Sequence, residues 1–270
     1  MKITVGLVNQ LRKITGIGIM DCKKALIDSN GNMDQAICSL RKKGKKIVIN
    51  HHSFGAKDGG LISSINRDNS CGSIIGISCE TDFLSRNFEF LDFLSMLSEK
   101  SLLYNTKEDF LSSSYDEDHN VKEVILYKMD IFGEKLDLKI FEKINSPFVM
   151  NYTHFNNKIA VIVGFSYKIS DVIAKNIAMH IAAMNPISID ENKFPNSLIK
   201  KEIEIIKHQV EKNKNSEKII KQVIQGKLKK FICNNTLINQ KFIKNDKITI
   251  REYLNTFNNL KINLFKRISI

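Results

Sequence analysis

The run LRKITGIGIMDCKKAL, residues 11–26, decides how the N-terminal part of this chain folds. Gly16 and Gly18 interrupt it, and glycine is unfavourable inside a helix because its backbone loses the most freedom there. On either side of these glycines the apolar side chains recur every three or four positions, which is the spacing of one helix face. The run therefore predicts a helix that ends near Thr15 and a second helix that begins near Ile19.

The same periodicity extends outward over residues 4–44 and predicts three short helices. Thr4 can cap the first helix and Asn32 the third, because each side chain can accept a hydrogen bond from a free backbone N–H. Asn30 and Gly31 end the second helix, since glycine readily adopts the left-handed conformation of a helix end. The apolar positions are Leu7, Leu11, Ile14, Cys22, Ala25, Leu26, Ala36, Ile37 and Leu40. We expect three helices around a small core, a pattern that resembles a module of the ubiquitin-associated type.

A basic segment at residues 45–57 is expected to link this module to two hairpin-plus-helix patterns. The first hairpin is predicted from apolar stretches at 59–65 and 73–79, and the second from stretches at 148–152 and 159–165. A helix with one apolar face follows each hairpin; the inward positions are Phe90, Phe93, Leu94 and Leu97, then Ile173, Ile177, Ala178 and Ile181. The repeated pattern predicts an α+β core of two related halves with antiparallel sheets.

Residues 196–232 change to a heptad-like pattern that predicts two paired helices. The apolar positions are Ile199, Ile203, Ile206 and Val210, then Ile220, Ile224, Leu228 and Phe231. The polar run at 212–216 can turn between the helices, so we expect an antiparallel coiled-coil hairpin inserted into the core. Residues 262–268 can then return as a last strand.

Three domains are expected from these patterns. Residues 1–55 hold the three-helix docking module and the linker. Residues 56–188 and 238–270 form the α+β core of two related halves. Residues 189–237 form the helical coiled-coil hairpin.

Composition limits the classes of function. The 270 residues carry a net charge of +12, which favours an acidic or polyanionic partner through long-range attraction. The five cysteines form no CxxC pair and are widely spaced, which argues against a disulfide framework or a zinc site and favours a reducing compartment. No apolar run approaches the roughly 20 residues of a membrane span, and no signal-peptide pattern opens the chain. We therefore expect a cytoplasmic protein without membrane contact.

No catalytic pattern stands out in the chain. The sequence has no P-loop, no dinucleotide fingerprint, no nucleophile elbow and no metal-spaced cluster of histidine and cysteine. His119 and His208 are expected to be solvated, and His180 to lie at the edge of the core. These observations predict a binding protein rather than an enzyme, with no catalytic residues, no metal and no cofactor.

Two motifs in this chain resemble signatures of the bacterial elongation factor Ts family. Residues 11–26 resemble its N-terminal signature, and Cys79-Glu80-Thr81-Asp82-Phe83 resembles its exchange motif. Further matches are Asp58-Gly59, Gly133-Glu134, Tyr152-Thr153-His154, residues 176–183 and residues 226–231. Because two separate motifs occur in the family's order and spacing, they are more specific together than either is alone, and the resemblance covers nearly the whole chain.

This resemblance implies a guanine-nucleotide exchange factor of translation elongation. The family binds elongation factor Tu with GDP, disturbs its magnesium and phosphate-loop site, releases GDP and allows GTP to rebind. By the resemblance, Phe83 would wedge between helices of the partner's nucleotide-binding domain, with Thr81 and Asp82 beside it. His154 falls where the family has a contact histidine at a hairpin turn. GDP affinity depends on Mg²⁺ and on phosphate-loop amides, so a small shift of either would loosen the nucleotide.

The resemblance also implies that the N-terminal module contacts the same partner through Arg12, Ile19 and Met20. The sequence departs from the family at Ile19, where methionine is frequent, although a branched side chain still offers apolar area. It also ends at Ile270, where the family commonly continues into a C-terminal helix, so we expect that contact to be absent. A homodimer and a heterotetramer with elongation factor Tu both stay open, and no direct nucleotide or nucleic-acid binding is expected.

Two other classes of function compete with this interpretation. The first alternative is a basic RNA- or ribosome-binding protein, which only the net charge supports. Retention on immobilised nucleic acid at moderate salt would favour it, because non-specific binding falls steeply as salt rises. The second alternative is an enzyme with an unrecognised site, and no motif in the chain supports it.

Overall fold

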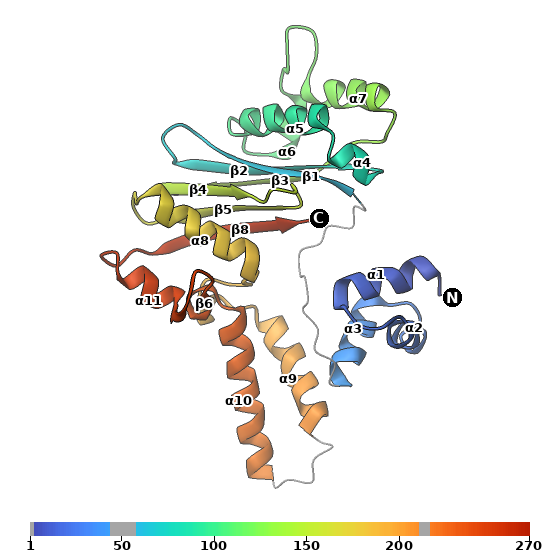
Figure 1. Ribbon diagram of the computed structural model, residues 1–270, viewed down its shortest axis with the longest axis vertical. Coiled ribbons are helices and arrows are strands. Elements are labelled where there is room, and N and C mark those ends of the chain that lie inside the picture. The colour runs from blue at the N-terminus through green and yellow to red at the C-terminus, as the bar shows by residue number, and fades with distance from the viewer. Residues whose placement is uncertain (1–2, 44–57, 211–216) are drawn as a thin grey trace. The chain divides into compact units, whose positions relative to one another are not determined.

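The computed structural model describes residues 3–43, 58–210 and 217–270. These residues form a mixed α+β protein with N-terminal helices, small antiparallel sheets and further helices, which confirms the predicted class (Figure 1). The contacts divide the chain into two compact units, Met1–His51 with Asp190–Thr236 and His52–Ile189 with Leu237–Ile270. The predicted linker at 45–57 and the predicted turn at 212–216 lie outside the described residues.

Three helices form the N-terminal part of the first unit, as predicted: α1 (Val5–Thr15), α2 (Ile19–Asp28) and α3 (Met33–Lys42). Thr4 Oγ1 accepts a hydrogen bond from the Leu7 N–H at 3.3 Å, and Asn32 Oδ1 accepts one from the Gln35 N–H at 3.0 Å. Both predicted caps are therefore confirmed. Gly16 ends α1 in the left-handed conformation with a φ of 68°. The core consists of Val8, Leu11, Ile17, Cys22, Ala25, Leu26, Ala36 and Leu40.

Two further helices of the first unit, α9 (Asn196–Val210) and α10 (Glu217–Asn235), contact each other where a helical hairpin is predicted. α9 also contacts α3, so it buries a wider face than the single predicted seam. Ile206 and Val210 of that seam are buried, and so is Ile205, which lies outside it. The buried side chain of Glu202 reaches from α9 to Arg41 of α3, where the two charged groups are 2.6 Å apart.

The second unit contains two three-stranded antiparallel sheets, with the orders β1-β2-β3 and β4-β5-β8 (Figure 1). In each sheet a hairpin is followed by a helix, and a later strand pairs with the second strand of the hairpin. The first set is β1 (Asp58–Ile65), β2 (Cys71–Cys79), α5 (Phe88–Ser101) and β3 (Asp137–Asn145). The second set is β4 (Phe148–Thr153), β5 (Ile159–Phe165), α8 (Asp171–Met184) and β8 (Ile262–Ser269).

Both predicted hairpins and the predicted last strand are confirmed by these sets. β3 has no predicted counterpart, because charged side chains are interspersed among its apolar ones. The two sheets pack face to face, and α5 and α8 cover their outer faces (Figure 1). Apolar side chains of both sheets fill the layer between them: Leu61, Ile74, Ile140, Ile144, Val149, Ala160, Ile162 and Ile268.

Short elements complete the described chain. Between α5 and β3 lie α6 (Lys107–Ser112) and α7 (Val121–Phe132). Between α8 and β8, besides α9 and α10, lie η1 (Glu191–Lys193), η2 (Leu237–Asn239), β6 (Lys241–Phe242), β7 (Asn245–Thr249) and α11 (Ile250–Asn255). Within the described ranges, every helix is too short or too polar to cross a bilayer.

His180 is fully buried in the second unit, so its predicted position at the edge of the core is wrong. The ring contacts Gln240 Oε1 through Nε2 at 3.1 Å, and Nδ1 accepts a hydrogen bond from the Ile243 N–H at 3.2 Å. Burial lowers the pKa of His180 to about 4, although the contact with Gln240 acts in the opposite direction. The neutral ring is therefore part of the core. His119 and His208 are exposed, as predicted.

Candidate partner-binding site

A one-turn helix, α4 (Asp82–Ser85), follows β2 and carries the predicted exchange motif. Thr81 caps this helix, because its Oγ1 accepts a hydrogen bond from the Leu84 N–H at 3.3 Å. Leu84 and Ser85 are buried, whereas Phe83 is 84% exposed. Since successive helix residues point about 100° apart, burying Leu84 directs Phe83 outward. Phe83 therefore has the exposure that a wedge between helices of a partner would require, and it lies on a helical turn directly after β2.

Glu134, which lies after α7, fixes the start of this turn. Its carboxylate accepts hydrogen bonds from the Glu80 N–H at 2.9 Å, from the Thr81 N–H at 3.0 Å and from the Thr81 hydroxyl. Partial burial acts to raise the pKa of Glu134, but the hydrogen bonds from Thr81 and Glu80 outweigh it and hold the pKa below its usual value. A helix of one turn is too short to be stable alone, so α4 depends on such contacts with other elements.

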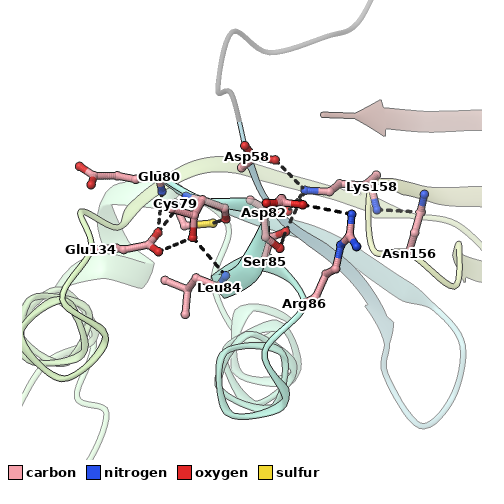
Figure 2. A network of polar contacts seen from close by, with 12 residues as sticks. Asp58, Cys79, Glu80, Asp82, Leu84, Ser85, Arg86, Glu134, Asn156 and Lys158 are labelled. Carbon is pink, nitrogen blue, oxygen red and sulfur yellow. Dashed lines mark hydrogen bonds and ion pairs between the residues drawn. The ribbon is translucent and has the colours of Figure 1, made fainter.

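Lys158 holds α4 from the opposite side, as Figure 2 shows. Its Nζ donates hydrogen bonds to the Gly59 carbonyl at 2.8 Å and to Ser85 Oγ at 3.2 Å. The same Nζ lies 3.6 Å from Asp58 Oδ1. Lys158 belongs to the turn between β4 and β5, so this one side chain joins that turn to both β1 and α4. The turn carrying Phe83 is therefore held by Glu134 on one side and by Lys158 on the other.

The exposed side of α4 carries opposite charges. Asp82 Oδ2 lies 3.2 Å from Arg86 Nη2, and both side chains are largely exposed to solvent. An exposed ion pair one helical turn apart contributes about 0.3–0.5 kcal/mol. Asp82 is therefore only weakly engaged within the chain and is available to a partner surface.

The predicted contact histidine, His154, is half-buried in the turn between β4 and β5. Its Nδ1 lies 3.0 Å from the Tyr152 hydroxyl, and its N–H donates to the Ile159 carbonyl at 2.8 Å. The structure thus brings the turn that carries His154 to α4, through Lys158. Neither Lys158 nor Glu134 can be identified from the sequence as a supporting residue, since their partners lie far away in the chain.

Arg12, Ile19 and Met20 belong to the first unit rather than to the unit that carries α4. Arg12 lies in the last turn of α1, and the other two residues open α2. All three are exposed, and Met20 is 77% accessible. Two neighbouring apolar side chains therefore face solvent beside the glycine break that the sequence identifies.

The site offers hydrogen bonds and apolar area rather than reactive groups. Among the residues that the structure describes, no group of three or more His, Cys, Asp or Glu side chains is arranged to hold a metal ion. Burial, together with the nearby Glu134 carboxylate, raises the pKa of the Cys79 thiol to about 11. The neutral thiol donates to the Thr81 carbonyl at 3.2 Å, so it supports the turn.

Known proteins match this chain over its whole length. The family model described as "Elongation factor TS" matches residues 80–270. An elongation factor Ts of Christiangramia forsetii is 38% identical, over 100% of this chain and 99% of the relative. An elongation factor Ts of Flavobacterium psychrophilum is 39% identical, over 99% of this chain and 98% of the relative. A third, from Nitratiruptor, is 38% identical, over 94% of this chain and 87% of the relative.

Proposed function

The chain belongs to the elongation factor Ts family, and we propose that it binds elongation factor Tu with GDP, releases the GDP and allows GTP to rebind. A member of this family is a non-catalytic exchange factor, so the proposal involves binding and conformational change without a covalent step. Because translation elongation takes place in the cytoplasm, we also propose a cytoplasmic location.

The observation that carries the mechanism is the exposure of Phe83 on a turn fixed from both sides. Insertion of this ring between helices of the partner would bury apolar area, at about 25 cal/mol for each Å². Glu134 and Lys158 support this role, because a ring on a fixed backbone loses little entropy on binding. Asp82 and Thr81 accompany Phe83 on the same turn, and His154 contacts the partner from the neighbouring turn.

Exchange requires that the factor prefer a distorted partner. GDP is held in such proteins by Mg²⁺ and by phosphate-loop N–H groups, so displacing the elements behind them weakens GDP binding. If the factor binds the nucleotide-free partner more tightly than the GDP-bound partner, GDP must weaken binding of the factor by the same ratio. The energy for GDP release therefore comes from the difference between these two binding free energies.

The domain roles form part of the same proposal. The three-helix module at residues 1–55 docks on the partner through Arg12, Ile19 and Met20. The core at 56–188 and 238–270, made of two related halves, presents Phe83 and His154. The helical hairpin at 189–237 is an accessory element of the chain.

Release of a fluorescent GDP from elongation factor Tu tests this mechanism. We expect the wild-type chain to accelerate release and Phe83→Ala to lose most of that acceleration, while its thermal midpoint stays unchanged because the ring is exposed. Equal release rates for the two proteins would remove Phe83 from the mechanism. An inactive wild-type chain that instead stays on immobilised RNA at moderate salt would support the RNA-binding alternative.

A further inference from the structure

Phe155 is the most exposed of the large apolar side chains that the structure describes, with 88% of its surface accessible. It lies in the turn between β4 and β5, where its neighbours His154, Asn156 and Asn157 are polar. An aromatic ring in water leaves a large apolar surface hydrated, which is unfavourable. The turn closes through its backbone and polar groups, so folding gives no reason for a phenylalanine at this position.

The backbone around Phe155 is held by several hydrogen bonds. The His154 N–H donates to the Ile159 carbonyl at 2.8 Å, and the Asn157 N–H donates to the His154 carbonyl at 2.8 Å. Asn157 adopts the left-handed conformation with a φ of 53°, which asparagine tolerates in turns. The Phe155 ring stands edge-on to the His154 ring at a centroid distance of 4.7 Å. The ring is therefore presented by an ordered turn.

The same turn is tied to the part of the chain that carries Phe83. Its carbonyl at Asn157 accepts a hydrogen bond from the Leu61 N–H of β1 at 2.7 Å. Lys158 adds the hydrogen bond to Ser85, the last residue of α4, at 3.2 Å (Figure 2). The α4 helix, which carries Phe83, and the β4–β5 turn, which carries Phe155, are thus joined by one network of hydrogen bonds.

We propose that Phe155 is a second apolar contact with the partner that receives Phe83. In this proposal Lys158 is the positioning residue that fixes the β4–β5 turn, which carries Phe155, relative to α4, which carries Phe83. This inference rests on the proposed function, because it assigns both rings to the same partner. Continuity of the surface supports that choice, since Phe155 adjoins His154 and its turn is bonded to α4. Rigidly held aromatic side chains are frequent among the residues that dominate interface energies. The partner therefore offers an apolar surface to Phe155.

The test compares Phe155→Ala with Leu103→Ala. Leu103 follows the C-terminal end of α5, far along that helix from α4, and is 77% exposed, so it controls for loss of exposed apolar area. We expect Phe155→Ala to raise the Kd for nucleotide-free elongation factor Tu about tenfold. With GDP-bound elongation factor Tu and a limiting amount of this chain, the same substitution should slow GDP release about tenfold. Leu103→Ala should stay within about twofold of the wild type.

The outcomes separate this inference from the proposed function. If the wild type accelerates GDP release and Phe155→Ala behaves like it, the inference is wrong and the proposed function stands. If the wild type does not accelerate release, the proposed function itself fails. Both substituted side chains are exposed, so both variants should keep the wild-type thermal midpoint.

The positioning role of Lys158 needs a readout other than activity alone. In a Lys158→Met background the turn loses its bonds to Ser85 and Gly59, so Phe155→Ala should then change Kd by less than about threefold. Lys158→Arg should restore most of the tenfold effect, because it can still donate to both oxygens. An unchanged tenfold effect of Phe155→Ala in the methionine background would show that Lys158 does not position this turn.

Discussion

Glu134 and Thr81 are joined by two hydrogen bonds, although 53 positions separate them in the chain. The carboxylate accepts both the backbone N–H of Thr81, at 3.0 Å, and its hydroxyl. Thr81 is the cap of α4, so the pair sets where that short helix begins and how it is oriented. The outward direction of Phe83 therefore depends on a carboxylate that lies after α7.

Removal of this carboxylate should impair exchange. Glu134→Ala removes the acceptor of the exposed Glu80 N–H and the part-buried Thr81 N–H, at a net cost of about 0.5–1.5 kcal/mol for each hydrogen bond. Because a helix as short as α4 is unstable without contacts to other elements, we expect GDP release to slow about fivefold to tenfold when the exchange factor is limiting. Glu252→Ala is a matched control, since Glu252 accepts from the Thr249 N–H and hydroxyl in the same way at α11. Similar rates for both variants would contradict the role of Glu134.

The ion pair between Arg41 and Glu202 should contribute strongly to the stability of the first unit. Arg41→Ala leaves a buried carboxylate unpaired, and we expect a loss of about 3 kcal/mol in the free energy of unfolding. Lys43→Ala, which breaks the exposed pair with Asp28 at 3.4 Å, should cost less than about 1 kcal/mol. Urea unfolding followed by far-UV circular dichroism measures both, since the chain has no tryptophan.

A second substitution in the Arg41→Ala background checks the cause of this loss of stability. Glu202→Gln added to Arg41→Ala should recover part of the loss, because the neutral amide costs less to bury than an unpaired charge. No recovery would mean that Arg41 stabilises the unit through its stacking on Phe231, whose ring centre lies 5.8 Å from the guanidinium, rather than through Glu202.

Acid should destabilise the second unit through His180. Its pKa is about 4 in the folded protein against 6.5 for the ordinary side chain, so the unfolded chain binds the proton more readily. The contribution of the neutral ring is therefore complete above about pH 6.5 and is lost as pH falls toward 4, by up to about 3 kcal/mol. We expect His180→Gln to reduce this pH dependence and His208→Gln, at an exposed position, to leave it unchanged. Unfolding curves at several pH values give the comparison, and equal slopes for the wild type and His180→Gln would refute it.

The second unit should fold without the helical hairpin. Backbone hydrogen bonds join Ser188 to Leu237 at 2.9 Å and Ile189 to Ile238 at 3.1 Å, so the two chain ends left by a deletion are already adjacent. We expect replacement of residues 190–236 by a short Gly/Ser linker to keep the cooperative thermal transition of the core, because loop entropy changes slowly with length. A variant without a cooperative transition would show that the core needs the hairpin.

Local features of this fold could be predicted from the sequence, because they depend on residues a few positions apart. The caps at Thr4 and Asn32 and the end of α1 at Gly16 each involve partners within four residues. The hairpins follow from apolar stretches on either side of short polar turns. The exchange motif could be located for the same reason, since it occupies consecutive positions.

Features that depend on distant partners could not be predicted in this way. The second face of α9 is buried because α3 lies against it, and β3 is a strand because β2 offers it a free edge. Neither condition leaves a periodic pattern in the segment itself.

The sequence by itself determined the family, the α+β class and the identity of the motif that ends in Phe83. Only the tertiary structure decided that Phe155 also faces solvent, and that Glu134 and Lys158 hold the turns that carry Phe83 and Phe155. The physical reason is that a side chain's exposure is set by what packs around it. A hydrogen bond between residues 53 or 73 positions apart exists only once the layers of the fold have brought them together.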